Sequence, residues 1–299
     1  RDVYIYTTEK EYIRDFEILA EPDSTLHDGY LDVILKTNGT YEGLGIDMSI
    51  IDSDGAVVAL DSRYANEDHI THMKAIVTNV KPWSAETPDL YTVVFTLKNN
   101  GVPIEYISTK IGFRSVEIKD GIIRINGERV VFKGTNRHEF DCHTGRYISE
   151  EVMRKDIELM KLNNINAVRT SHYPNCPCWY EVCDEYGLYV IDENNMETHG
   201  TGWSQIIGCP QLPASRPEWE KACMERIKAL YQRDKNCTCV VAWSLGNESL
   251  GGETPKKMYR WIKEQDKSRF VHFECDRAPD EKELSDVQSK MYARPWECE

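Results

Sequence analysis

Short runs of alternating apolar and polar residues fill the first third of the chain. They are rich in Val, Ile, Thr and Tyr, and turn sequences such as TNGT, DSDG and KNNG separate them. The runs are YLDVILKT, LGIDMSIID, AVVALDS, THMKAIVTNV, LYTVVFTL and IEYISTKIGF. This spacing predicts that residues 1–115 form an antiparallel β-sandwich of the immunoglobulin type.

After residue 115, short apolar runs alternate with segments of helical periodicity. The runs are VVFKG, NAVRTS, LYVIDENN, CVVAWSLGNE and FVHFECD, with MYA at 291–293 as the start of a sixth. The first helix has Ser149 as its expected N-cap and an apolar face at residues 152, 153, 157, 159, 160 and 162. Strand–helix repetition without a G-x-G-x-x-G motif or P-loop predicts an incomplete (β/α)8 TIM barrel over residues 116–299, from strand one to about strand six.

The charge and cysteine content narrow the class of partner. With 36 Lys and Arg against 50 Asp and Glu, the net charge is −14, which argues against nucleic acid or a membrane surface as partner. No run approaches the roughly 20 apolar residues of a membrane span. Two C-x-C pairs, Cys176/Cys178 and Cys237/Cys239, are interpreted as small apolar residues, because metal sites use wider spacing. We therefore expect a reduced, cytoplasmic protein.

Polar residues follow the end of each predicted strand: Asn136–Glu139, Arg169–Tyr173, Asp192–Asn194 and Asn247–Glu248. In barrel enzymes the carboxyl ends of the strands form the active face. Glu248 ends the buried run VVAWSL, where a carboxylate has to be desolvated, paired or functional. Structural roles stay open for the others, since Arg169 could only form an ion pair, for instance with Asp192, and His172 could be an ordinary loop histidine.

Glu197 and His199 provide a candidate metal site. In an extended segment, residues two apart point to the same side. Together with Glu248 they could provide three ligands. Two carboxylates and one imidazole suit Mg²⁺, although Zn²⁺ would also accept them.

Long motifs in the chain resemble glycoside hydrolase family 2. NAVRTSHYPNCPCWYEVCDEYGLYV and DKNCTCVVAWSLGNE are similar to its two signature segments, while KGTNRHEFD, DENNMETHG, WSLGNESLGG and MYAR resemble its β-galactosidase branch. KPWSAETPDLY and IGFR resemble the sandwich domain of the family. One departure is Cys237-Thr238-Cys239, where the family usually has His, often followed by Pro-Ser. We expect this departure at the base of the fourth strand, with little effect on catalysis.

The resemblance implies retaining hydrolysis of a terminal β-galactoside by two carboxyl groups about 5–5.5 Å apart. It implies that Glu248 is the general acid and base, and that Mg²⁺ is the cofactor, with ligands Glu197, His199 and Glu248. It also implies that the sugar is bound by Asn247, His138, His172 and Tyr292, the last beside the nucleophile.

The nucleophile of the family, at the end of the seventh strand, has no match in this chain. Glu274 is the one other barrel-placed carboxylate, and we expect it on the fifth strand beside Glu248 rather than opposite. The chain, which begins at Arg1, is thus expected to be an internal piece of a homo-oligomeric β-galactosidase, inactive alone and prone to self-association. Two alternatives remain: a non-catalytic sugar- or cation-binding piece, and a family 2 enzyme for another sugar, such as a glucuronide or mannoside.

Overall fold

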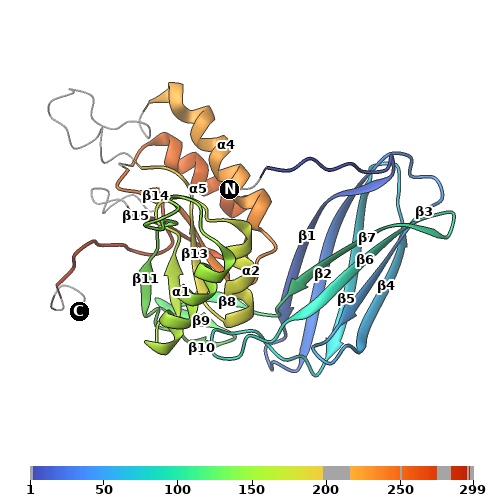
Figure 1. Ribbon diagram of the computed structural model, residues 1–299, viewed down its shortest axis with the longest axis horizontal. Coiled ribbons are helices and arrows are strands. Elements are labelled where there is room, and N and C mark those ends of the chain that lie inside the picture. Colours follow the sequence, from blue (N-terminus) through green and yellow to red (C-terminus); the bar gives the residue numbers. More distant parts are fainter. Residues whose placement is uncertain (1–2, 198–215, 250, 275–283, 295, 297–299) are drawn as a thin grey trace.

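The computed structural model describes residues 3–197, 216–249, 251–274, 284–294 and 296. An antiparallel sandwich is followed by a parallel sheet flanked by helices, which confirms the predicted fold class (Figure 1). The sandwich consists of a three-stranded sheet in the order β1-β2-β5 and a four-stranded sheet in the order β4-β3-β6-β7. Its strands are β1 (Tyr12–Pro22), β2 (Asp28–Asn38), β3 (Leu44–Ile51), β4 (Val57–Tyr64), β5 (Ile70–Thr78), β6 (Tyr91–Asn99) and β7 (Val102–Ile111).

All six predicted sandwich strands form, and β1 is an additional one. In β3 and β6 every second residue is buried, because successive side chains of a strand point to opposite faces. Met48 and Phe95 are among the residues that fill the core in this way. β1 escaped prediction because a register shift between Ile13 and Asp15 interrupts its alternation.

Five parallel strands form the second sheet in the order β11-β12-β13-β14-β15, so that neighbours in sequence are neighbours in space. They are β11 (Gly134–Asn136), β12 (Ala167–Arg169), β13 (Tyr189–Glu193), β14 (Val240–Asn247) and β15 (Phe270–Glu274). The accompanying helices are α1 (Glu150–Leu162), α2 (Pro177–Tyr186), α4 (Pro217–Asp234) and α5 (Glu253–Gln265). A small antiparallel sheet precedes them, formed by β8 (Val116–Lys119), β9 (Ile122–Ile125) and β10 (Glu128–Arg129).

The expected start of a sixth strand near residue 291 is wrong, because Met291 and Tyr292 form a turn. The preceding segment instead lies along the edge of β15. The backbone N–H of Asp286 donates to the carbonyl oxygen of Val271 at 2.8 Å, and the Asp286 carboxylate accepts from the N–H of Val271 at 2.7 Å. These two hydrogen bonds satisfy the N–H and the carbonyl oxygen of Val271, which a further strand would otherwise pair.

Helix α1 begins as predicted but has a narrower buried face. The Ser149 hydroxyl accepts a hydrogen bond from the N–H of Val152 at 3.4 Å, which confirms the N-cap. Met153 and Ile157 are buried, whereas Leu159 and Leu162 are 52% and 79% exposed. Successive residues of a helix advance by about 100°, so these two leucines lie on the side opposite Ile157.

Buried polar contacts fix the sandwich to the base of the parallel sheet. The guanidinium group of Arg114 donates to the carbonyl oxygens of Thr238 and Val240, both at 2.6 Å. The N–H of Gly112 donates to the Thr238 hydroxyl at 2.8 Å. A Cβ at Gly112 would lie 2.5 Å from the Cβ of Trp83, so this approach requires glycine. Thr238, which departs from the family motif, is therefore part of the contact between the sandwich and the parallel sheet.

All seven cysteines in the described part of the chain are free thiols. Burial raises the pKa values of Cys237 and Cys239 well above the usual range, so both remain neutral. This agrees with their interpretation as small apolar residues. Among the described helices, none combines the length and the apolar character needed to cross a bilayer.

Candidate active site

The carboxylate of Glu193 is the centre of the polar network at the carboxyl ends of the strands. Glu193 ends β13 and is fully buried. Its Oε2 accepts from Arg169 Nε and from the Ser244 hydroxyl, each at 2.6 Å, and its Oε1 lies 2.7 Å from Nδ1 of His172. Burial by itself would raise the pKa of Glu193, but the His172 hydrogen bond, the Arg169 charge and the Ser244 hydroxyl outweigh burial and lower it. The carboxylate is therefore ionised.

Glu193, and not Asp192, is the ion-pair partner of Arg169. Neighbouring residues of a strand point to opposite faces, so these two carboxyl groups point away from each other. Asp192 accepts hydrogen bonds from the hydroxyl of Tyr180 on α2 at 2.6 Å and from the Thr170 hydroxyl at 3.1 Å. Burial raises its pKa well above the usual value, and the nearby charge of Asp234 adds to the rise. The expectation of an Arg169–Asp192 pair is corrected accordingly.

The end of β14 is held by contacts on both sides of Asn247. Its side-chain oxygen accepts from Arg169 Nη2 at 2.8 Å, and its side-chain nitrogen donates to Oε2 of Glu197 at 2.7 Å. The backbone N–H of Asn247 also donates to the carbonyl oxygen of Met196 at 2.9 Å. Glu248 follows directly, half-buried and in the left-handed region with a φ of 41°. Asn247 thereby fixes the point from which the Glu248 side chain projects.

His138 and His172 lie together beside this network. Their ring centroids are 5.4 Å apart, in an edge-to-face arrangement with an interplanar angle of 78°. The ring of Tyr173 lies 5.9 Å from that of His138. Burial, His172 and the charge of Arg146 lower the pKa of His138. His138 can therefore offer a neutral imidazole nitrogen to polar groups of a ligand.

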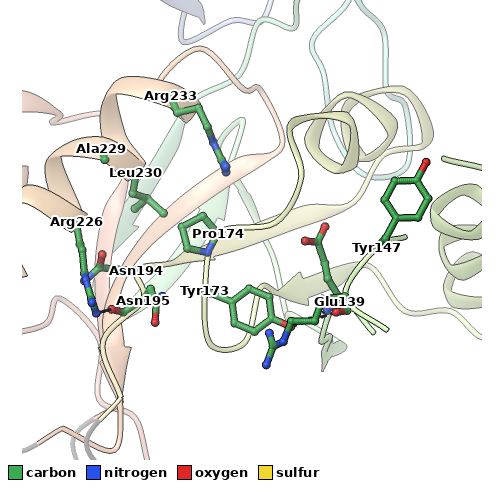
Figure 2. A pocket seen from close by; sticks show the side chains of 11 residues that line it. Glu139, Tyr147, Tyr173, Pro174, Asn194, Asn195, Arg226, Ala229, Leu230 and Arg233 are labelled. Atoms are coloured by element: carbon green, nitrogen blue, oxygen red, sulfur yellow. Dashed lines mark hydrogen bonds between the residues drawn. The ribbon is translucent and has the colours of Figure 1, made fainter. Parts of the chain in front are cut away.

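A cavity of about 890 Å³ is lined by Glu139 and Tyr173, the chain neighbours of His138 and His172, and was not predicted from the sequence. Figure 2 shows Tyr173 and Pro174 between the side chains of α4, such as Arg226, and Glu139, which lies beyond the end of β11. Arg146 also lines the cavity and stacks over the Tyr173 ring at 5.0 Å. Because the lining residues come from four separate segments, no single sequence motif indicates this cavity.

The remaining predicted site residues are not gathered around Glu193. Tyr292 is 93% exposed in its turn, and His199 lies outside the described residues. Within the described ranges, no group of three or more His, Cys, Asp or Glu side chains is arranged to hold a metal ion. Glu274 pairs with Asn247 in the β14–β15 register and thus lies on the strand next to Glu248, at its predicted position.

Family models match both parts of the chain. The model described as the TIM barrel domain of glycosyl hydrolases family 2 matches residues 116–298, and a second model of glycosyl hydrolases family 2 matches residues 11–114. The chain belongs to glycosyl hydrolase family 2.

Relatives within glycosyl hydrolase family 2 are substantially longer than this chain. The β-galactosidase of Streptococcus thermophilus is 45% identical over 303 residues, an alignment that covers the whole chain and 29% of the relative. The β-galactosidase of Priestia megaterium is 44% identical over 311 residues and is covered to 30%. The chain thus spans about 30% of the length of these relatives.

Solved structures of the family share the fold at lower identity. A β-glucuronidase from Ruminococcus gnavus in complex with D-glucuronic acid gives a TM-score of 0.73 at 26% identity, covering 88% of this chain and 42% of that chain. A β-D-glucuronidase from Dictyoglomus thermophilum gives a TM-score of 0.77 at 24% identity, covering 92% of this chain and 46% of that chain.

Proposed function

We propose that this chain carries the acid/base half of an active site that hydrolyses terminal β-galactosides, such as lactose, with retention of configuration. The observation that carries the proposal is the end of β14, where Asn247 is held between Arg169 and Glu197 and directs Glu248 away from the strand. Identity of 45% to a β-galactosidase, against 26% to a β-glucuronidase of known structure, supports galactose as the sugar.

In this proposal, Glu248 donates a proton to the departing glycosidic oxygen and later accepts one from water. Asn247 binds the sugar 2-hydroxyl. An amide nitrogen carries two hydrogens, and that of Asn247 uses one on Glu197, so the other is available for the sugar. His138 and His172, whose rings pack edge to face, contact further hydroxyl groups of the galactose.

The second carboxylate of the reaction has to face Glu248 at about 5–5.5 Å. Glu193 is fully buried and committed to three hydrogen-bond donors. Glu274 lies on the adjacent strand rather than across from Glu248. We therefore propose that neither of these two carboxylates of the described part of the chain is the nucleophile.

Magnesium is proposed as the cofactor, with Glu197, Glu248 and His199 as its ligands. Carboxylate oxygens suit this ion, and Asn247 holds the Glu197 carboxylate next to the position of Glu248. A bound Mg²⁺ would supply positive charge that adjusts the acidity of Glu248. Calorimetric titration with Mg²⁺ should give heat that Glu197→Gln removes and that Glu218→Gln, a change at an exposed position of α4, retains. Equal heats would refute the ligand set.

The proposed sugar is tested by comparing ligands. Isothermal titration of the chain with galactose, glucuronic acid and mannose should give its largest response with galactose. A preference for glucuronic acid would favour the β-glucuronidase alternative, which the shared fold supports. If a longer protein that contains the chain binds a sugar but does not hydrolyse it, the non-catalytic alternative is the one supported.

The free thiols in the described part of the chain support a reducing cytoplasm as the proposed location.

A further inference from the structure

We propose that Glu193 is a positioning residue that fixes the hydrogen on His172 and, through Arg169, the orientation of the Asn247 amide. Glu193 is fully buried and thus acts on the sugar only through other side chains. The inference rests on the proposed function, because His172 and Asn247 are the groups that contact galactose there. It assigns a role to a residue that the sequence motifs alone did not single out.

The hydrogen on His172 follows from the chemistry of its partner. An ionised carboxylate can only accept hydrogen bonds, and Oε1 of Glu193 lies 2.7 Å from Nδ1 of His172. Nδ1 must therefore carry the hydrogen. In the neutral ring, Nε2 is then left with its lone pair and accepts a hydrogen bond from a sugar hydroxyl. The opposite tautomer would offer a donor at that position.

The Glu193 carboxylate also orients the amide of Asn247, indirectly through Arg169. Arg169 donates from Nε to Glu193, which fixes the plane of its guanidinium group. The Nη2 of that group reaches the side-chain oxygen of Asn247 at 2.8 Å, and a guanidinium can only donate. The Asn247 nitrogen consequently turns toward Glu197. The buried charge of Glu193 therefore fixes the hydrogen on His172 and the orientation of the Asn247 amide, the two groups proposed to recognise the sugar.

A hydrogen-bonded chain behind Glu193 keeps the carboxylate in place. The single hydroxyl hydrogen of Ser244 goes to Glu193, so Nδ1 of His272, 2.9 Å away, must donate to the Ser244 oxygen. Burial lowers the pKa of His272 to about 4, which makes its ring neutral near pH 7. The Ser289 hydroxyl, which lies 3.3 Å from Nε2 of His272, donates its hydrogen to the Glu274 carboxylate. These contacts link β13, β14 and β15 behind the site.

The simpler role for Glu193 is to balance the charge of Arg169. In that case, a neutral replacement would reduce stability without moving any hydrogen on His172. The two roles differ in Glu193→Gln. The amide oxygen of glutamine can accept from Arg169 and Ser244, and its nitrogen then faces Nδ1 of His172 as a donor. Nδ1 must become an acceptor, and the hydrogen moves to Nε2.

The experiment is nitrogen NMR of the histidine rings in the 299-residue chain, with the His172 signals assigned by their loss in His172→Gln. The wild type should show hydrogen on Nδ1 of the neutral His172 ring. Glu193→Gln should shift it to Nε2, whereas Glu193→Asp, which keeps the charge, should largely restore the wild-type pattern. Ser244→Ala is the matched control, since it removes a different hydrogen bond from the same carboxylate and should leave the His172 hydrogen on Nδ1.

Hydrogen on Nε2 of His172 in the wild type would overturn the proposal without any variant, even if Glu193→Gln did not fold. A folded Glu193→Gln with the hydrogen still on Nδ1 would also overturn it. Neither result depends on turnover. Failure of the chain to bind galactose would count against the proposed function alone, while the ring signals would still decide the role of Glu193.

Discussion

At the scale of single residues, the site depends on charges that are buried but fully partnered. Taking a carboxylate out of water is costly unless hydrogen bonds and an opposite charge compensate it. Glu193 has an arginine, a histidine and a serine for this purpose, so it remains ionised inside the protein. His272 shows the converse case, a buried imidazole that remains neutral.

The first prediction concerns the pH dependence of stability. Burial lowers the pKa of His272 to about 4, whereas an unfolded histidine titrates near 6.5. Between these values the unfolded chain binds more protons, so the free energy of unfolding falls as the pH falls. His272 should contribute a loss of roughly 1 kcal/mol per pH unit in this range. In urea unfolding at pH 6 and pH 5, His272→Asn should show a smaller drop than the wild type.

His72, which is exposed on β5, provides the control for this measurement. His72→Asn should retain the wild-type difference between the two pH values. An equal pH dependence in His272→Asn and the wild type would mean that His272 is protonated in the folded protein, contrary to the neutral ring inferred from its burial.

The limits of sequence-based prediction are also clearest at individual residues. The first four residues of LYVIDENN are all apolar and do not alternate with polar ones, so the pattern does not show which of Asp192 and Glu193 faces the strand ends. Only the register of β13 within the sheet decides this. The exposed turn at Tyr292 was also not evident from the sequence. Its motif resembles the end of a strand, but its backbone pairs with no strand in the described part of the chain. Glu248 and Asn247, by contrast, could be placed because a long apolar run ends at them.

At the scale of elements, β14 carries the site because its end is held against the loop after β13. Gly246 lies in a conformation that favours glycine, with a φ of 152°. A Cβ there would lie 2.5 Å from the carbonyl oxygen of Met196. That carbonyl accepts the hydrogen bond of the Asn247 N–H, so the close approach and the placement of Asn247 are linked.

Gly246→Ala should therefore push β14 away from Met196. We expect a loss of about 1–3 kcal/mol in the free energy of unfolding, typical of overpacking, together with weaker galactose binding. Gly45→Ala on β3 is the control, because its Cβ would meet nothing closer than 3.7 Å. Chemical unfolding and calorimetry measure the two effects. A Gly246→Ala protein as stable as Gly45→Ala would show that the contact with Met196 does not constrain the strand.

Most elements were predictable because their periodicity is strong, and the exceptions have local causes. The sandwich strands alternate strictly where one face is buried, and β1 escaped notice because of its register shift. Ser149 was a good signal for the start of α1, since its hydroxyl satisfies a helix N–H. The extent of the buried face of α1 depends instead on which neighbours cover it.

At the scale of the whole molecule, the sandwich and the parallel sheet are joined by hydrogen bonds from a buried cation. Arg114 donates to the carbonyl oxygens of two residues at the base of β14. Arg114→Met should remove both bonds and lower the free energy of unfolding by at least about 2 kcal/mol, since bonds from charged donors are worth about 1.5–3 kcal/mol each. Scanning calorimetry should show the two parts unfolding less cooperatively. Arg63→Met, a change at an exposed side chain, should leave the transition unaltered.

Association of the isolated chain is a further prediction at this scale. β11 is an edge strand of the parallel sheet, and its residues are exposed or half-buried. Open strand edges favour pairing with other chains. Light scattering should therefore show a mass that rises with concentration, and Asn136→Pro, which removes a backbone donor that faces the open edge, should reduce the rise. A concentration-independent monomer would contradict this prediction.

The proposed function depends above all on Glu248 acting as the acid/base of a β-galactosidase site. The decisive experiment replaces the matching segment of the Streptococcus thermophilus β-galactosidase with this chain and compares lactose with a β-galactoside of an activated phenol. Glu248→Gln should slow lactose hydrolysis about 10²–10⁴-fold and the activated substrate far less, because a good leaving group does not need the proton. Glu253→Gln, at the exposed start of α5, should change neither rate. Equal slowing of both substrates by Glu248→Gln, or no slowing, would contradict the acid/base role.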